Sequence, residues 1–504
     1  MFIDCFYDNE KNTLLKEVYV IGTKNMGKKS LGVNAFLNGF RNILNMIVPL
    51  FTLPYITRIL GAVNLGKYNF ANSIVSYFIL IAGLGISTYA IREGAKYRTD
   101  EYKMSVFASE IFSINILSML LAYILLFITV ISVSVVHKYY NIIFIISLSI
   151  CFTTIGCDWI FSIYEEYLYI TIRGIIVQLV YVILLVIGVR SNNDLVKYCW
   201  IMLLSSSGTC LINIFELRKI CRIHFTLNMN LKKHLPAIFI IFANVIATSI
   251  YTNSDMTILG ILTSDYEVGI YTITVKIYNI VKQLLAAIII VAVPRLSLLW
   301  GENKKKEFNM TLETIANMLF SLACPALVGI FSLSNEIVFI VGGNEFLEAS
   351  FSLKIICYAL LFSVFSWFFT DCILIPCKKE KKVLVVTIIA AVSNILFNFI
   401  LIPYGKQNAA AFTTLMAEFI SMILSGVYAL KISRISLKYR NVMGTIIGCI
   451  LIYLICLVFR NFNISIVLYL LLSIVSSAII YISVQLVIRN PVYYDLFKKN
   501  MRIK

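Results

Sequence analysis

The fold of this chain is decided by a pattern that is clearest between Lys378 and Pro403, where the sequence reads KKEKKVLVVTIIAAVSNILFNFILIP. Five charged residues lead directly into 21 residues that carry no charge. A membrane-spanning helix needs about 20 predominantly apolar residues, and a basic segment beside such a helix marks the cytoplasmic side of the membrane. The stretch therefore predicts a transmembrane helix that begins on the inner side.

The same pattern recurs along all 504 residues, where fourteen apolar stretches are separated by short polar segments. When each stretch is one crossing, the inner segments carry 32 of the 43 Lys and Arg residues and the outer gaps carry 6. This bias predicts that both termini are cytoplasmic. It also accounts for the net charge of +17, so no nucleic-acid partner is needed to explain it. The predicted crossings are 35–56, 69–91, 104–132, 140–157, 172–189, 196–217, 235–262, 268–293, 311–334, 350–377, 383–403, 408–430, 441–459 and 463–488.

The composition excludes a soluble globular protein, because 60% of the residues are hydrophobic, 14% are charged and the mean hydropathy is +0.88. The connections between crossings are too short to hold a catalytic domain. Neither H-E-x-x-H nor G-x-S-x-G nor a complete phosphate-binding loop is present, and the 12 cysteines form no C-x-x-C pair. We therefore expect a protein that is not an enzyme and that has no metal or cofactor.

The first twelve crossings form two related sets of six. Ile59-Leu60-Gly61 followed by Gly66-x-Tyr68 matches Ile258-Leu259-Gly260 followed by Gly269-x-Tyr271. Parallel repeats of this kind flank a central cavity in many secondary transporters. We predict an all-α integral membrane protein of about 14 transmembrane helices, with two six-helix lobes around a central cavity and two additional helices. The predicted domains are a cytoplasmic segment (1–31), the first lobe (32–217), a basic cytoplasmic linker (218–234), the second lobe (235–430), the additional helices (431–488) and a basic cytoplasmic tail (489–504).

Charged residues inside the crossings indicate where that cavity lies. A charge at the centre of a membrane helix costs about 2.5–3.5 kcal/mol, so these side chains should face water, each other or a ligand. On the first crossing, asparagines and an arginine recur at the spacing of one helix face. We predict substrate contacts from the cations Arg41, Lys276 and Lys282 and from the amides Asn38, Asn42, Asn45 and Asn279.

Two acidic residues, Asp255 and Glu418, are candidates for charge balance or for ion coupling. Each of the predicted roles has a structural alternative. The asparagines can act as hydrogen bonds between helices, Arg41 can extend to the inner membrane surface, and Asp255 or Glu418 can simply neutralise a lysine. A cavity with fixed cations, amides and hydroxyls suits an anionic ligand rich in hydroxyl groups, such as a diphosphate that carries sugars. A hydrophobic cation would be repelled.

Several ordered motifs resemble the bacterial O-antigen and capsular polysaccharide flippases, the polysaccharide-transporter branch of the multidrug/oligosaccharidyl-lipid/polysaccharide exporter superfamily. The resemblance implies a V-shaped, two-lobed helical fold in the bacterial inner membrane. It implies translocation of undecaprenyl-diphosphate-linked oligosaccharides to the outer leaflet, with the membrane lipids, a polysaccharide polymerase and a chain-length regulator as partners. The motifs are Pro54-Tyr-Ile-Thr-Arg-Ile-Leu-Gly61, Gly66-Lys-Tyr68, Trp159-x-Phe161 with Glu165, Glu166 and Arg173, Tyr251-Thr-Asn-Ser-Asp255, Pro294-Arg-Leu296, and Ile402-Pro-Tyr-Gly405 with Ala409, Ala410 and Glu418.

Three other interpretations remain open from the sequence. A drug or cation antiporter of the same superfamily should have a cavity dominated by carboxylates. A scaffolding membrane protein would give the buried charges no purpose, and an integral-membrane polymerase would need a sizeable outer loop. The identity of the sugar, the coupling ion, the oligomeric state and the choice between Met1 and Met26 as the native start are also open.

Overall fold

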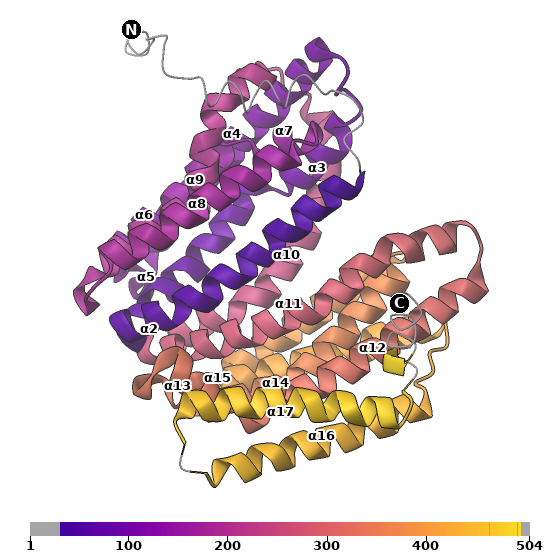
Figure 1. Cartoon of the computed structure of the whole chain (residues 1–504). Helices are drawn as coiled ribbons and strands as arrows, with labels where there is room; N and C mark the ends of the chain where they lie inside the picture. Colours follow the sequence, from indigo (N-terminus) through magenta and orange to yellow (C-terminus); the bar gives the residue numbers. More distant parts are fainter. Residues whose placement is uncertain (1–30, 463, 491, 495–504) are drawn as a thin grey trace, which may run out of the picture.

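The structure is a computed structural model that describes residues 31–462, 464–490 and 492–494. Within these ranges the side chains of residues 31–47, Arg218 and Asn244 lie outside the description. The described chain is built of helices and contains no β-strand (Figure 1). This confirms the predicted all-α class.

The first group of helices covers residues 31–220. Its members are α2 (Leu31–Gly83), α3 (Ile86–Gly94), α4 (Glu101–Ser132), α5 (Ser134–His137), α6 (Tyr140–Ile155), α7 (Asp158–Ile163), α8 (Tyr167–Gly188), η1 (Asn192–Asp194) and α9 (Leu195–Ile220). We call this group the first bundle.

The remaining helices begin at residue 231, after a non-helical segment. They are α10 (Leu231–Leu262), α11 (Asp265–Gly301), α12 (Lys305–Ser332), α13 (Ser334–Gly342), η2 (Asn344–Phe346), α14 (Ala349–Trp367), η3 (Phe368–Leu374), α15 (Glu380–Leu430), α16 (Tyr439–Arg460) and α17 (Ile466–Val487). We call α10–α15 the second bundle. The last two helices, α16 and α17, lie at the side of the second bundle. They pack against each other and against α12 and α13 (Figure 1).

In the described part of the chain, 11 helices are long and apolar enough to cross a membrane. Two of them contain a break. Gly61 interrupts α2 with a φ of 72°, and Lys406 interrupts α15 with a φ of 49°. Each of these long helices thus contains two crossings that the sequence predicts separately, and the connections expected at 57–68 and 404–407 are largely helical. The total of about fourteen crossings and the internal repeat stay predictions.

The outer surface of the helices is apolar, as a membrane requires. Phe127 of α4 is 68% exposed, Ile187 of α8 is 59% exposed and Ile479 of α17 is 60% exposed. Many hydroxyl and amide side chains, in contrast, are buried between helices. Because hydrocarbon offers no hydrogen bonds, this inside-out distribution is the one expected when lipid is the solvent.

The two bundles meet at one end of the molecule and diverge from it (Figure 1). At the contact, the carboxylate of Glu345 accepts a hydrogen bond of 2.8 Å from the backbone N–H of Ala62, just after the break in α2. Arg58 donates to the carbonyl oxygen of Ile340 over 2.8 Å. The carboxylate also lies at the start of a helical segment, where negative charge is favoured. By the charge bias of the sequence, this end is the predicted outer side.

Helix α10 connects the bundles at the other end. His234, near its start, lies 2.9 Å from the Glu110 carboxylate of α4 and 2.7 Å from the Tyr89 hydroxyl of α3. Asn230 donates a further hydrogen bond of 2.9 Å to Glu110. The carboxylate of Glu110 thus has hydrogen-bonding neighbours, and these contacts tie the first turn of α10 to the first bundle.

Candidate functional site

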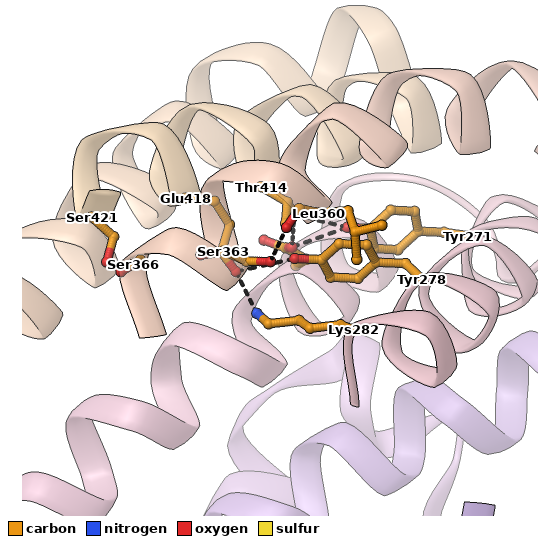
Figure 2. A network of polar contacts seen from close by, with 10 residues as sticks. Tyr271, Tyr278, Lys282, Leu360, Ser363, Ser366, Thr414, Glu418 and Ser421 are labelled. Atoms are coloured by element: carbon orange, nitrogen blue, oxygen red, sulfur yellow. Dashed lines mark hydrogen bonds and ion pairs between the residues drawn. The ribbon is translucent and has the colours of Figure 1, made fainter. Parts of the chain in front are cut away.

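A network of polar side chains lies inside the second bundle, between α10, α11, α14 and α15 (Figure 2). The helices approach closely because α15 presents the buried run Ala409-Ala410-Ala411 after its break. Tyrosine and lysine side chains of α11 point from one side toward Thr414 and Glu418 of α15 and Ser363 of α14 on the other (Figure 2). Two carboxylates, Asp255 and Glu418, are the charged centres of this network.

Asp255 is buried and is surrounded by neutral donors. It accepts hydrogen bonds from the amide of Asn398 at 2.6 Å, from the hydroxyl of Tyr271 at 3.0 Å and from the hydroxyl of Thr414 at 2.5 Å. Among the described residues, no lysine, arginine or histidine forms an ion pair with it. A buried carboxylate is costly unless it is paired or protonated. Its surroundings therefore suit a proton or a small cation.

Glu418 has a cationic partner. Lys282 Nζ lies 2.6 Å from Glu418 Oε1, and the Tyr278 hydroxyl donates to the same oxygen over 3.2 Å. Both members of the pair are buried. The ammonium group also lies over the Trp367 ring, 4.5 Å from its centroid, a distance at which a cation and an aromatic face attract each other. Lys282 is thus held by Glu418 and two aromatic rings in this structure.

Lys276 is placed differently. It is half-buried on α11, and it has no hydrogen-bond or ion-pair partner among the described residues. Asn279, three residues further, is exposed. Because 276 and 282 differ by six positions, a straight helix turns their side chains about 120° apart. The two lysines therefore lie in different surroundings. Lys276 and Asn279 lie on the more accessible face of α11.

Four predicted substrate contacts cannot be placed. Arg41, Asn38, Asn42 and Asn45 lie on the first half of α2, where the backbone is described but the side chains are outside the described residues. Their roles stay predictions. The site is consequently built from α10, α11, α14 and α15.

Sequence reasoning missed several members of the network. Asn394 and Asn398 both lie on α15 and are linked by a hydrogen bond of 3.1 Å, and Ser254 donates to Asn394 over 2.8 Å. Their spacing of four residues inside an apolar crossing was the available signal. The contact of Trp367 with Lys282 had no comparable signal, since it joins residues 85 positions apart.

Polar contacts also join the two bundles. Thr257 of α10 donates to the Ser73 hydroxyl of α2 over 2.9 Å and lies 3.2 Å from the Tyr77 hydroxyl. These are neutral, hydroxyl-only contacts. They can exchange for water at little cost.

Over the part of the chain that the structure describes, no group of three or more His, Cys, Asp or Glu side chains converges. What the site combines is one compensated charge pair, one carboxylate among neutral donors and one accessible lysine. Such a set can bind and release charged species without bond chemistry.

Apolar, multi-pass helical bundles with charges buried between them define the class of this protein as a multi-pass helical membrane protein. The chain belongs to the family described as polysaccharide biosynthesis protein, which matches residues 31–300. Residues 240–400 also match the family described as MatE. The family confirms the resemblance that the motifs indicated.

Individual proteins agree with this assignment. The chain is 26% identical over 408 residues to the "Putative O-antigen transporter" of Escherichia coli K12. The aligned region covers 78% of this chain and 95% of that protein. It is 24% identical over 400 residues to the capsular polysaccharide biosynthesis protein CapF of Staphylococcus aureus, with coverages of 76% and 95%.

Among solved structures, the fold is similar to the lipid II flippase MurJ in an inward closed conformation. The TM-score is 0.75 at 16% identity, and the match covers 92% of this chain and 99% of that one. An inward-facing multidrug resistance MATE transporter gives a TM-score of 0.54 at 12% identity, and covers 77% of this chain and 97% of the other. The shared fold therefore extends over almost the whole chain.

Proposed function

We propose that this protein is a flippase that moves undecaprenyl-diphosphate-linked oligosaccharide units from the inner to the outer leaflet of the bacterial inner membrane. The units would serve the synthesis of O-antigen, capsule or a related surface polysaccharide. The observation that carries the proposal is the match of residues 31–300 to the polysaccharide biosynthesis family. The names of the two relatives and the fold of a lipid II flippase point in the same direction.

The transport itself would proceed by alternating access, without nucleotide hydrolysis and without a chemical reaction of the substrate. The bundles meet at the predicted outer end and diverge toward the predicted inner end (Figure 1), so this arrangement would receive substrate from the cytoplasmic side. Lys276 and Asn279 on the accessible face of α11 would meet the diphosphate and the first sugar. Arg41, Asn38, Asn42 and Asn45 stay further proposed substrate contacts.

Energy for the cycle would come from an ion that binds in the second bundle. Asp255, which accepts three hydrogen bonds from neutral groups, would take up a proton or a monovalent cation. Lys282 and Glu418 would form the adjacent charge pair. Loss of either charge would leave the other side chain without its ionic partner.

A multidrug or cation antiporter is the second candidate, because residues 240–400 match the MatE family and the second bundle contains three buried carboxylates, Asp255, Glu267 and Glu418. Two features favour the flippase. The MATE likeness covers 77% of this chain, whereas the MurJ likeness covers 92%. Lys276 would also repel a cationic drug. Protection of cells from cationic dyes on expression of the protein would favour the antiporter.

The cellular partners would be the polysaccharide polymerase and the chain-length regulator, with both termini of this chain in the cytoplasm. Deletion of the gene should leave lipid-linked oligosaccharide in the inner leaflet, where an added periplasmic glycosidase cannot reach it. Complementation with Lys276→Ala should fail to restore surface polysaccharide at normal protein level, whereas Lys197→Ala, at an exposed lysine, should restore it. Normal polymer from the Lys276→Ala strain would contradict the assigned site.

A further inference from the structure

The first bundle contains a cavity of about 290 Å³ between α2, α6 and α9. It is separate from the charged network of the second bundle. None of the residues that line it is charged. Six of them carry a hydroxyl or an amide, and the others are apolar; the six are Tyr68, Asn72, Ser149, Thr153, Ser205 and Ser206.

Most of the hydroxyl groups have their protons engaged within their own helices. Ser149 donates to the carbonyl of Ile146 over 2.7 Å, and Thr153 donates to the carbonyl of Ser149 over 2.7 Å. Ser206 donates to Leu203 over 3.1 Å. A hydroxyl that donates to its own backbone keeps its lone pairs as acceptors. The wall therefore offers hydrogen-bond acceptors to whatever fills the cavity.

Asn72 supplies the complementary groups. Its amide has no hydrogen-bond partner among the described residues, although it lies on a membrane-spanning helix and is half-buried. A primary amide brings two N–H donors and one acceptor. Leaving all of them unsatisfied at membrane depth would be costly. The side chain is therefore placed for a polar occupant of the cavity.

The aromatic part of the cavity wall is held by a neighbouring ring. The Tyr68 ring packs edge-on against Tyr198, with centroids 4.9 Å apart and the planes at 70°. Tyr68 is nearly buried, and a held ring of this kind offers a flat apolar face beside a polar hydroxyl. An occupant with both C–H and O–H surfaces matches this wall best.

These features together select a neutral sugar. Each sugar hydroxyl can donate to the lone pairs of the wall and accept from the Asn72 amide. An anion would meet acceptors without a cation, and an acyl chain would leave the polar wall unsatisfied. Ligand pockets run from roughly 300 to 1,000 Å³, so a cavity of about 290 Å³ suits one sugar ring and is too small for a whole oligosaccharide.

The cavity also lies next to the contact between the bundles. Ser73, the neighbour of Asn72, accepts a hydrogen bond from Thr257 of α10. A substrate with its diphosphate at Lys276 and one sugar in this cavity would touch both bundles. A ligand can shift a conformational equilibrium only by binding its states differently, and contact with both moving parts provides that difference.

We infer that this cavity of the first bundle is a carbohydrate subsite, which takes one uncharged sugar ring of the lipid-linked glycan, with Asn72 as its main specificity determinant. The inference rests on the proposed flippase function and adds the site at which the protein recognises a sugar of the substrate. It assigns the lipid diphosphate to the second bundle and the glycan to the first.

The test compares two probes on purified protein in nanodiscs. One is undecaprenyl diphosphate, and the other is the lipid-linked oligosaccharide extracted from cells that lack the gene. The wild-type protein should bind the oligosaccharide form at least about tenfold more tightly. Asn72→Leu, which removes two or three neutral hydrogen bonds, should lower that affinity about tenfold and leave the affinity for undecaprenyl diphosphate unchanged.

Asn69→Leu is the matched control, because this asparagine lies on the same helix, one turn away, and its amide already donates to Leu65 over 2.7 Å. It does not line the cavity, so it should bind both probes like the wild type. Thr153→Val is a second, more conservative variant that tests the same inference if Asn72→Leu folds poorly. Thr153 is exposed at the cavity wall, and the change keeps the shape and removes only the hydroxyl. We expect a threefold or greater loss, again for the glycan probe alone.

The possible outcomes separate this inference from the proposed function. If both probes bind the wild type equally, or if Asn72→Leu and Thr153→Val bind the glycan normally, the cavity is a water-filled packing gap and the subsite is wrong, while diphosphate recognition stands. If neither probe binds the wild type, both the flippase proposal and the subsite are wrong.

Discussion

Gly66 of α2 and Gly269 of α11 lie in backbone contact where the two bundles meet. A Cβ atom on Gly66 would overlap the carbonyl oxygen of Asp265 and would lie 3.0 Å from the backbone nitrogen of Gly269. A Cβ atom on Gly269 would overlap the carbonyl oxygen of Ala62. These two glycines are also the ones that the sequence places at equivalent positions of the predicted repeat. Their lack of side chains lets α2 and α11 close the molecule at this end.

Gly66→Ala should therefore disfavour the closed contact. Overpacking costs about 1–3 kcal/mol, and here the cost falls on the contact between bundles rather than on either bundle alone. Spin labels at Val63 and Leu347, both exposed, should lie further apart than in the wild-type protein when their separation is measured by double electron–electron resonance. Transport should also fall. Gly83→Ala is the control, because a Cβ there meets nothing within 4 Å. Unchanged distances in Gly66→Ala would refute the role of the contact.

The Lys282–Glu418 pair should behave as one unit. Removing one partner of a buried ion pair costs about 3–5 kcal/mol, because it strands the other charge. Lys282→Met and Glu418→Gln should each lower the melting temperature, and the double variant should recover most of the loss. Intrinsic fluorescence during thermal unfolding in detergent measures this. Lys197→Met at the exposed Lys197–Asp194 pair should change little. If the losses in the double variant simply add, the pair is not the source of the stability.

Asp255→Asn should separate stability from ion coupling. The change removes a buried charge that no described cation compensates, so the melting temperature should hold or rise. Transport of the lipid-linked oligosaccharide into proteoliposomes should lose its response to an imposed proton or sodium gradient. Asn253→Ala is the control, since the amide of Asn253 donates to its own helix at Ser249 over 3.1 Å. A gradient response that persists in Asp255→Asn would place coupling elsewhere.

His234→Ala should loosen the start of α10 from the first bundle. It removes one of the two partners of the buried Glu110 carboxylate, at 2.9 Å, and the partner of the Tyr89 hydroxyl, at 2.7 Å, while Asn230 still donates to Glu110. Buried groups left without partners cost about 1–3 kcal/mol, and we expect a lower melting temperature with faster trypsin cleavage at the exposed Arg222. His224→Ala is matched to it, because His224 is exposed. Equal cleavage rates in the two variants would show that the His234 contact is dispensable.

The sequence by itself determined the class of the protein. Apolar stretches of about 20 residues cross a membrane as helices, because hydrocarbon offers no hydrogen-bond partners for the backbone N–H and C=O groups. The same physical cost made Lys276, Lys282, Asp255 and Glu418 visible as candidates, because charges in apolar helices are rare. Both inferences depend on local composition, which a sequence states directly.

Only the tertiary structure decided how these charges are grouped. It joins Lys282 to Glu418 across 136 positions, surrounds Asp255 with the hydroxyl and amide groups of α11 and α15, and leaves Lys276 on an accessible face. It also encloses the neutral cavity of the first bundle. Hydrogen bonds and ion pairs act over a few ångströms in space. Which residues come that close depends on how the helices pack, and apolar helices of similar composition do not encode their neighbours in any short stretch of sequence.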